Sequence, residues 1–166
     1  MASTPDNGEL TIVTSLGPIR LQADARGLTR IILPGSGDSG ETASRLSATE
    51  HPVLIEAARQ INEYLAGERT VFTLPLAPSG TPFQLHVWEI IGQIPWGTTM
   101  TYGAIARLLG QSSKARAVGG AARANPLPLV IPCHRVIGAD GSLTGFACGL
   151  GMKELLLRRE GVLPGR

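Results

Sequence analysis

The chain has 166 residues, of which 43% are hydrophobic and 17% are charged. This composition is typical of a globular protein and excludes a disordered chain. No apolar run reaches the roughly 18 residues that a membrane-spanning helix requires. The polar N-terminal segment MASTPDNGEL has neither the basic start nor the apolar stretch of a secretory signal. We therefore expect a cytoplasmic protein without membrane contacts.

The net charge of +2 conceals an uneven distribution. Residues 1–89 contain six basic and ten acidic residues, whereas residues 90–166 contain nine basic and three acidic residues. No acidic residue lies between positions 90 and 139, a segment with five cations: Arg107, Lys114, Arg116, Arg123 and Arg135. A polyanionic partner such as a nucleic acid explains this pattern. The alternative is a chance absence of acids in a region rich in Ala, Gly and Leu.

Three short runs of alternating hydrophobic residues predict β-strands near the N-terminus. The runs are ELTIVTS, GPIRLQA and LTRIIL, and turn signals at Gly17-Pro18 and Gly27 separate them. An antiparallel meander fits this spacing. The next segment, PGSGDSGETASRLS, is predicted to be a polar loop.

The segment HPVLIEAARQINEYLAG predicts a helix that ends at Gly67. Its expected hydrophobic stripe consists of Leu54, Ala58, Ile61 and Leu65. The following TVFTLPLAP is predicted to be a short strand or an extended connector. We therefore expect two domains, residues 1–78 and residues 79–166.

The second half begins with a strong helix-start signal. Thr81 can cap the helix, Pro82 occupies its first position and Gln84 completes a capping box. The expected apolar face of this helix consists of Phe83, Val87, Ile90 and Ile91. The segments TYGAIARLLG and SKARAVGGAARAN predict two short helices around a polar QSS turn. This arrangement is typical of a helix-turn-helix motif, although it also occurs in helical bundles.

The last part of the chain is predicted to contain a strand-like run and a final helix. Asn125-Pro126 should end the preceding helix, because a residue before proline avoids the α conformation. The apolar run LPLVIPCHRVIG then has β character. MKELLLRREG predicts a helix that packs through Leu155 and Leu156 and ends at Gly161.

The sequence PCHRV places Cys133 beside His134 and Arg135. A thiol needs a base or a positive environment to become nucleophilic at neutral pH. Consecutive side chains on a strand point to opposite faces, so His134 reaches the sulfur only if the backbone leaves extended geometry near Pro132. Otherwise Cys133 is a small buried hydrophobic residue. The two cysteines of the chain are too few for a disulfide framework or a zinc site, and we expect no metal or cofactor.

The segment IPCHRVIGADGSLTGFACGLGMKELLLRREG resembles the active-site region of the O6-alkylguanine-DNA alkyltransferases, whose signature is PCHR. The resemblance continues upstream through FQLHVWEIIGQIPWGTTMTYGAIARLLG and SKARAVGGAARANPLPLVIPCHR, and more loosely through LGPIRLQADARGLTRI. It implies an α/β architecture: an N-terminal ribonuclease-H-like domain with a small antiparallel sheet and a helix, followed by a C-terminal winged-helix domain that binds DNA.

The resemblance also implies a reaction and its catalytic residues. Cys133 would accept an alkyl group from O6 of guanine, and from O4 of alkylthymine, in one irreversible transfer that consumes the protein. His134 would contact the thiol through an ordered water and would be steadied by Glu160. Tyr102 would hydrogen-bond the departing guanine and help to extrude the base. Asn125 would brace the turn that leads to the thiol.

For DNA binding, the resemblance implies that one small-residue helix enters the minor groove and that the damaged base is extruded. Arg116 would intercalate in place of the extruded nucleotide, unless it is a phosphate-facing charge. The other implied DNA-binding residues are Lys114, Ala115, Gly119, Arg123 and Tyr102. We expect sequence-independent binding to double-stranded DNA by a monomer, with cooperative assembly on DNA as a further possibility.

The implied alkyl pocket consists of Val136, Phe146, Ala147 and Cys148. This chain departs from the family at two of these positions, because Cys148 replaces a usual glycine and Phe146 a frequent tyrosine. Three other functions remain open: a damage-recognition protein without transfer activity, against which Cys133 argues; a transcription regulator, which would need no Cys-His-Glu set; and a cysteine hydrolase, which would turn over without DNA.

Overall fold

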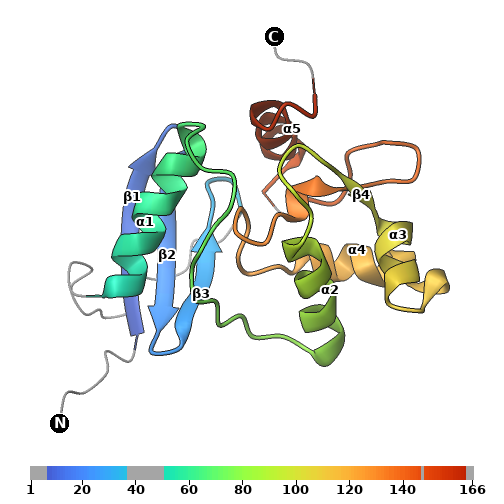
Figure 1. The fold of residues 1–166 in the computed structure, drawn as a ribbon, viewed down its shortest axis with the longest axis horizontal. Helices are drawn as coiled ribbons and strands as arrows, with labels where there is room; N and C mark the ends of the chain where they lie inside the picture. The colour runs from blue at the N-terminus through green and yellow to red at the C-terminus, as the bar shows by residue number, and fades with distance from the viewer. Residues whose placement is uncertain (1–6, 37–50, 147, 164–166) are drawn as a thin grey trace. The chain divides into compact units, whose positions relative to one another are not determined.

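The computed structural model describes residues 7–36, 51–146 and 148–163. The chain divides into two compact units, residues 1–79 and residues 80–166 (Figure 1). Within the described part of the chain, no helix has the length and hydropathy of a membrane span.

The N-terminal unit contains the predicted antiparallel meander. Strands β1 (Asn7–Thr14), β2 (Gly17–Asp24) and β3 (Gly27–Ile32) pair in the order β1-β2-β3. Gly27 has a φ of +152° and allows a close backbone approach, since a Cβ there would lie 2.5 Å from the carbonyl oxygen of Pro75. The connector that contains Pro75 forms only an isolated bridge, between Leu28 and Leu76, and is not a full strand.

Helix α1 (Pro52–Leu65) lies over one face of this sheet (Figure 1). Its buried side is formed by Leu54, Ala57, Gln60, Ile61 and Tyr64. The predicted stripe was therefore wrong at Ala58 and Leu65, which are only half-buried. Gln60 is compatible with this buried face because its side chain accepts a hydrogen bond from the backbone of Thr73 and donates one to the same residue.

The C-terminal unit begins with α2 (Pro82–Gly92), whose predicted capping box is confirmed: the Thr81 hydroxyl accepts from the Gln84 N–H, and the Gln84 side chain accepts from the Thr81 N–H. The buried residues of α2 are Val87, Trp88 and Ile91, whereas Phe83 and Ile90 are half-buried. Trp88 was absent from the predicted face. Its indole N–H donates to the carbonyl of Ala121 at 2.8 Å, which links α2 to helix α4 (Ala115–Arg123).

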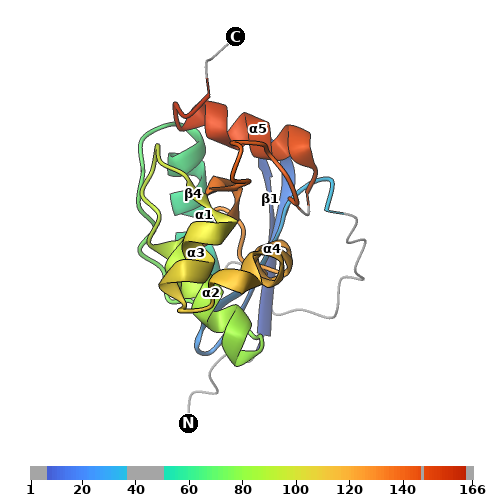
Figure 2. The ribbon, with the colours of Figure 1, turned by 90° about the vertical axis from the view of Figure 1, so that its right-hand side faces the viewer.

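The helix-turn-helix motif is formed by α3 (Tyr102–Leu108) and α4 (Ala115–Arg123), which pack together (Figure 2). Thr101 caps α3 through the N–H of Ala104, and Gly110 follows that helix with a φ of +71°. A short 3₁₀ helix, Ser112–Lys114, makes the turn. The predicted helix-turn-helix architecture is therefore confirmed.

The run LPLVIPCHRVIG was wrongly predicted as a strand over most of its length. Only β5 (Val136–Ile137) is a strand, and it pairs in parallel with β4 (Met100–Thr101). A 3₁₀ helix spans Cys133–Arg135, and the run also contains Leu129, with a φ of +75°. The two prolines within the run lack the N–H groups that a strand needs for its ladder.

The last helix, α5 (Leu150–Arg159), buries Lys153, Leu156 and Leu157. Gly161 follows it with a φ of +76°, as its predicted role in ending the helix requires. The expectation that Leu155 packs was wrong, because 39% of this side chain is exposed.

Candidate active site

Cys133 lies at the start of the 3₁₀ helix with only 6% of its surface exposed. Pro132, with φ −79° and ψ 68°, leaves extended geometry immediately before it. Cys133 and His134 are therefore not on opposite faces of a strand. The backbone leaves extended geometry near Pro132, which a thiol-base pair at these two positions requires.

A buried hydrogen-bond network joins the thiol segment to the end of α5. The Glu160 carboxylate lies 2.6 Å from Nε2 of His134. The same carboxylate accepts two hydrogen bonds from Arg135, from Nε at 2.7 Å and from Nη2 at 2.9 Å. Arg135 also donates to the carbonyl of Ile94 at 2.5 Å. A paired arginine and carboxylate of this kind satisfy each other's charge in the interior.

This network fixes the proton arrangement of the imidazole. Burial lowers the pKa of His134 below its usual 6.5, and this effect outweighs the opposing influence of Glu160. A neutral imidazole beside a carboxylate donates its Nε2 hydrogen to it, which leaves the lone pair on Nδ1. Among the described residues, His134 Nδ1 is buried without a hydrogen-bond partner. His134 can therefore accept a proton at Nδ1.

The thiol itself is protonated at rest. Burial raises the pKa of Cys133 to about 11, and the nearby Cys148 raises it as well. A side-chain hydrogen bond from Asn125 and the charge of Lys153 act in the opposite direction. At neutral pH only roughly one thiol in ten thousand is then ionised, so a nucleophilic Cys133 needs a base when it reacts.

Asn125 braces the turn that precedes the thiol. Its side-chain amide donates to the carbonyl of Ile131 at 2.7 Å, and its side-chain oxygen accepts from the N–H of Leu127 at 2.9 Å. Between these two anchor points lies Leu129, a buried residue in the left-handed backbone region. Such a conformation costs about 1–3 kcal/mol and persists only where surrounding contacts hold it. The two hydrogen bonds of Asn125 hold the backbone on either side of Leu129.

Lys153 is a site residue that the sequence interpretation missed. It is 1% exposed, and its ammonium donates to the carbonyls of Val136 at 2.5 Å and Thr144 at 2.8 Å. The ammonium also lies 5.8 Å from the centre of the Tyr102 ring. Burial lowers the pKa of Lys153 to about 8. The predicted site residue Tyr102 donates its hydroxyl hydrogen to the same Thr144 carbonyl at 2.8 Å.

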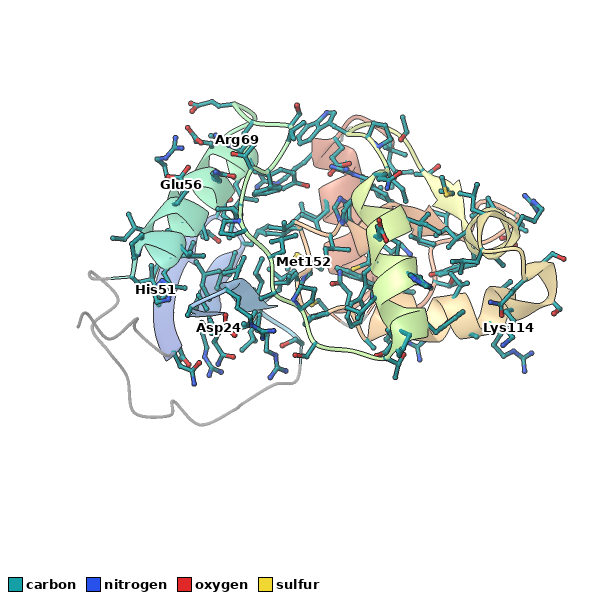
Figure 3. All side chains as sticks on the ribbon, turned by 60° about the horizontal axis from the view of Figure 1, so that its bottom comes forward. Asp24, His51, Glu56, Arg69, Lys114 and Met152 are labelled. Atoms are coloured by element: carbon teal, nitrogen blue, oxygen red, sulfur yellow. The ribbon has the colours of Figure 1, made fainter. Side chains whose placement is uncertain are left out.

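Four of the five cations in the acid-free segment are exposed: Arg107, Lys114, Arg116 and Arg123. Lys114, labelled in Figure 3, directly precedes α4. Its ammonium lies 5.9 Å from the centre of the Phe83 ring. Arg135 does not belong to this set. Its guanidinium is buried on Glu160, so the interpretation of Arg135 as a cation available to a polyanion was wrong.

The small residues of α4 differ in their surroundings. Gly119 faces the ring of Tyr102, where a Cβ would lie 3.7 Å away, while Gly120 is exposed and Ala115 is half-buried. Of the expected pocket residues, Val136 is fully buried, and Phe146 and Cys148 are half-buried. The remaining expected pocket residue, Ala147, lies outside the described residues.

Comparison with known proteins identifies two matching families. Residues 82–162 match the DNA-binding domain of 6-O-methylguanine DNA methyltransferase, and residues 9–78 match the ribonuclease-like domain of the same protein. A methylated-DNA–protein-cysteine methyltransferase of Methanosarcina acetivorans is 44% identical over 88% of this chain and 93% of its own length. A constitutive protein of that name from Bacillus subtilis is 42% identical over 82% of this chain and 84% of its own length.

Solved structures agree with the sequence matches. The crystal structure of the Mycobacterium tuberculosis O6-methylguanine methyltransferase has a TM-score of 0.80 and 37% identity, and the match covers 96% of each chain. A structure of the M. tuberculosis protein in complex with DNA has a TM-score of 0.81 over 93% of each chain. Both halves of the chain thus match in sequence and fold, and the chain belongs to the 6-O-methylguanine DNA methyltransferase family.

Proposed function

We propose that this chain repairs double-stranded DNA by transferring the alkyl group of O6-alkylguanine, and of O4-alkylthymine, irreversibly to Cys133. The observation that carries the proposal is the buried network in which Glu160 accepts the Nε2 hydrogen of His134 and leaves Nδ1 free to take a proton. The names of the relatives, which describe transfer from methylated DNA to a protein cysteine, agree with it.

In the proposed reaction, His134 removes the Cys133 proton through a bridging water as the sulfur attacks the alkyl carbon. The sulfur–carbon bond forms, the carbon–O6 bond breaks, and the proton ends on the restored guanine, which stays in its DNA strand. A base is required because burial raises the pKa of the thiol to about 11. No step regenerates the thiol, so each molecule acts once.

The chemistry requires that the base leaves the duplex, because O6 of a stacked guanine is inaccessible to a buried thiol. Extrusion costs a few kcal/mol. We propose that α4 enters the minor groove, that Lys114 and Arg123 contact phosphates, and that Arg116 fills the gap in the base stack. The exposure of these cations and the small side chains of α4 support this docking mode. We further propose that the protein acts as a monomer.

The direct test is to mix the protein with a duplex that contains O6-methylguanine and to digest it with trypsin. Cleavage after Arg123 and Arg135 isolates Cys133 in peptide 124–135, and cleavage after Lys153 isolates Cys148 in peptide 136–153. We expect one methyl group on peptide 124–135, and none in Cys133→Ser. Tight binding to the damaged duplex without any methylated peptide would instead indicate a recognition protein.

Arg116→Ala should slow transfer from duplex DNA by about tenfold to a hundredfold, because roughly 1.4–3 kcal/mol of support for the extruded state is lost. Transfer from free O6-methylguanine base should stay unchanged. Arg116→Lys distinguishes the two possible roles, since it restores a phosphate contact but not a planar wedge. Equal losses on duplex and free base would contradict the wedge, and full rescue by lysine would identify Arg116 as a phosphate contact.

A further inference from the structure

The side chain of Lys153 binds both the segment that follows Cys133 and the segment that precedes Cys148. Lys153 holds together the backbone on either side of the intervening loop, because its ammonium bonds the carbonyls of Val136 and Thr144. Val136 follows Cys133 by three residues, and Thr144 precedes Cys148 by four. One ammonium therefore holds Thr144 close to Val136, three residues after the first thiol. Consistent with this, Cys148 raises the pKa of the Cys133 thiol by electrostatic interaction.

The two thiols differ in their access to solvent. Cys133 is buried, whereas Cys148 is only half-buried. A small oxidant that approaches from solvent therefore meets Cys148 first. Both thiols are free, and burial raises the pKa of each to about 11, so their reaction with an oxidant is slow at neutral pH and accelerates as the pH rises.

One glycine lies on each side of Cys148 in the sequence. Gly145 and Gly149 have φ values of +67° and +95°. The N–H of Gly149 donates to the carbonyl of Phe146 at 3.0 Å. A disulfide requires a Cα–Cα separation of roughly 4.4–6.8 Å. Glycine adopts more backbone conformations than other residues, so Gly145 and Gly149 allow Cys148 to approach Cys133 while Lys153 holds the carbonyl of Thr144.

We propose that Cys148 and Cys133 form a reversible intramolecular disulfide when the protein meets a peroxide. Hydrogen peroxide first oxidises the Cys148 thiol to a sulfenic acid and releases one water. The sulfur of Cys133 then attacks the Cys148 sulfur and passes its proton, through the same bridging water, to Nδ1 of His134. The sulfur–oxygen bond breaks, the sulfur–sulfur bond forms, and the hydroxide leaves as a second water after protonation. Two thiols are oxidised, and one peroxide is reduced to water.

The disulfide itself does not depend on alkyl transfer, but its consequence rests on the proposed function. A disulfide occupies the sulfur that would attack the alkyl group, so the oxidised protein is inactive. It also prevents further oxidation of that sulfur to sulfinic acid, which thiols do not reverse. Cys148 thus preserves a thiol that can be used only once, until a dithiol reductant restores it.

The test treats the full-length reduced protein with a small molar excess of hydrogen peroxide, blocks remaining thiols under denaturing conditions and digests with trypsin without reduction. We expect peptides 124–135 and 136–153 to be joined and to lack two hydrogens. Dithiothreitol should separate them and restore methyl acceptance. In Cys148→Ser, the same treatment should leave sulfinic acid on Cys133, which dithiothreitol does not reverse. Each protein is compared with its own reduced sample as the control.

Free Cys148 beside a sulfinic Cys133 in the wild-type protein would overturn the proposal, as would a disulfide that forms only between two chains and disappears on dilution. These results are independent of repair activity. If reduced protein never accepts a methyl group but the joined peptides appear, the proposed function fails and the disulfide stands.

Discussion

Replacement of Glu160 by glutamine should lower the free energy of unfolding by about 3–5 kcal/mol, because it leaves the buried guanidinium of Arg135 without its counter-charge. Transfer should slow by about a hundredfold or more, within the range that positioned acid-base groups contribute. The reason is that the amide no longer orients the Nε2 hydrogen of His134. Denaturant titration and single-turnover kinetics measure the two effects.

The pH dependence of transfer distinguishes lost orientation from simple loss of stability. Glu160 raises the pKa of His134, so its removal lowers that pKa. The fall in rate at acidic pH, where the imidazole becomes protonated, should therefore move to lower pH in Glu160→Gln. Glu154→Gln is the matched control on the same helix, because Glu154 pairs with Arg158 at the surface. It should change stability by no more than about 0.5 kcal/mol, and an equal loss in both variants would refute the role of Glu160.

Replacement of Lys153 by methionine should slow transfer by about tenfold or more. The ammonium lowers the pKa of the Cys133 thiol, so its removal should raise that pKa further. Two backbone carbonyls, of Val136 and Thr144, also lose a charged donor. The pH dependence of Cys133 alkylation by a small reagent measures the pKa, and single-turnover kinetics measure the transfer.

The effect of Lys153 should itself depend on pH. Burial lowers its pKa to about 8, so the ammonium is charged below this value and loses its charge above it. The difference between the wild-type protein and Lys153→Met should therefore narrow as the pH rises beyond 8. Arg158→Met, at a partly exposed position on the same helix, should leave the thiol pKa unchanged. A rate difference that stays constant with pH would contradict an electrostatic role for Lys153.

Local signals predicted the elements that depend on local physics. The capping box of Thr81 and Gln84 acts within one helical turn, and the meander depends on alternating residues and two glycine turns. The conformation of the segment around Cys133, in contrast, could not be predicted from local signals. Its apolar run had the composition of a strand, but the bracing by Asn125 and the left-handed backbone of Leu129 result from contacts that composition does not encode.

Among the site residues, too, some could be predicted from local spacing and others only from the tertiary structure. The side chains of Lys153, Leu156, Leu157 and Glu160 follow the i, i+3, i+4, i+7 spacing of one helix face. This spacing could have identified Lys153 as buried beside Glu160, although not which carbonyls it contacts. For Arg135 no such signal existed, because its partners, Glu160 and the Ile94 carbonyl, are distant in sequence. Burial of an arginine in an acid-free segment depends on tertiary structure.

Cys133 is buried as a neutral thiol, beside a neutral His134 and the paired charges of Arg135 and Glu160. The proposed reaction therefore removes no charge from the thiol when it converts it to a thioether. A thioether is uncharged as well, so a molecule that has reacted keeps the net charge of +2 and every exposed cation of its helix-turn-helix motif. The salt dependence of its attraction to undamaged DNA is then unchanged. Used molecules compete with fresh ones for the same duplex, and only a change in shape or removal of the used protein relieves that competition.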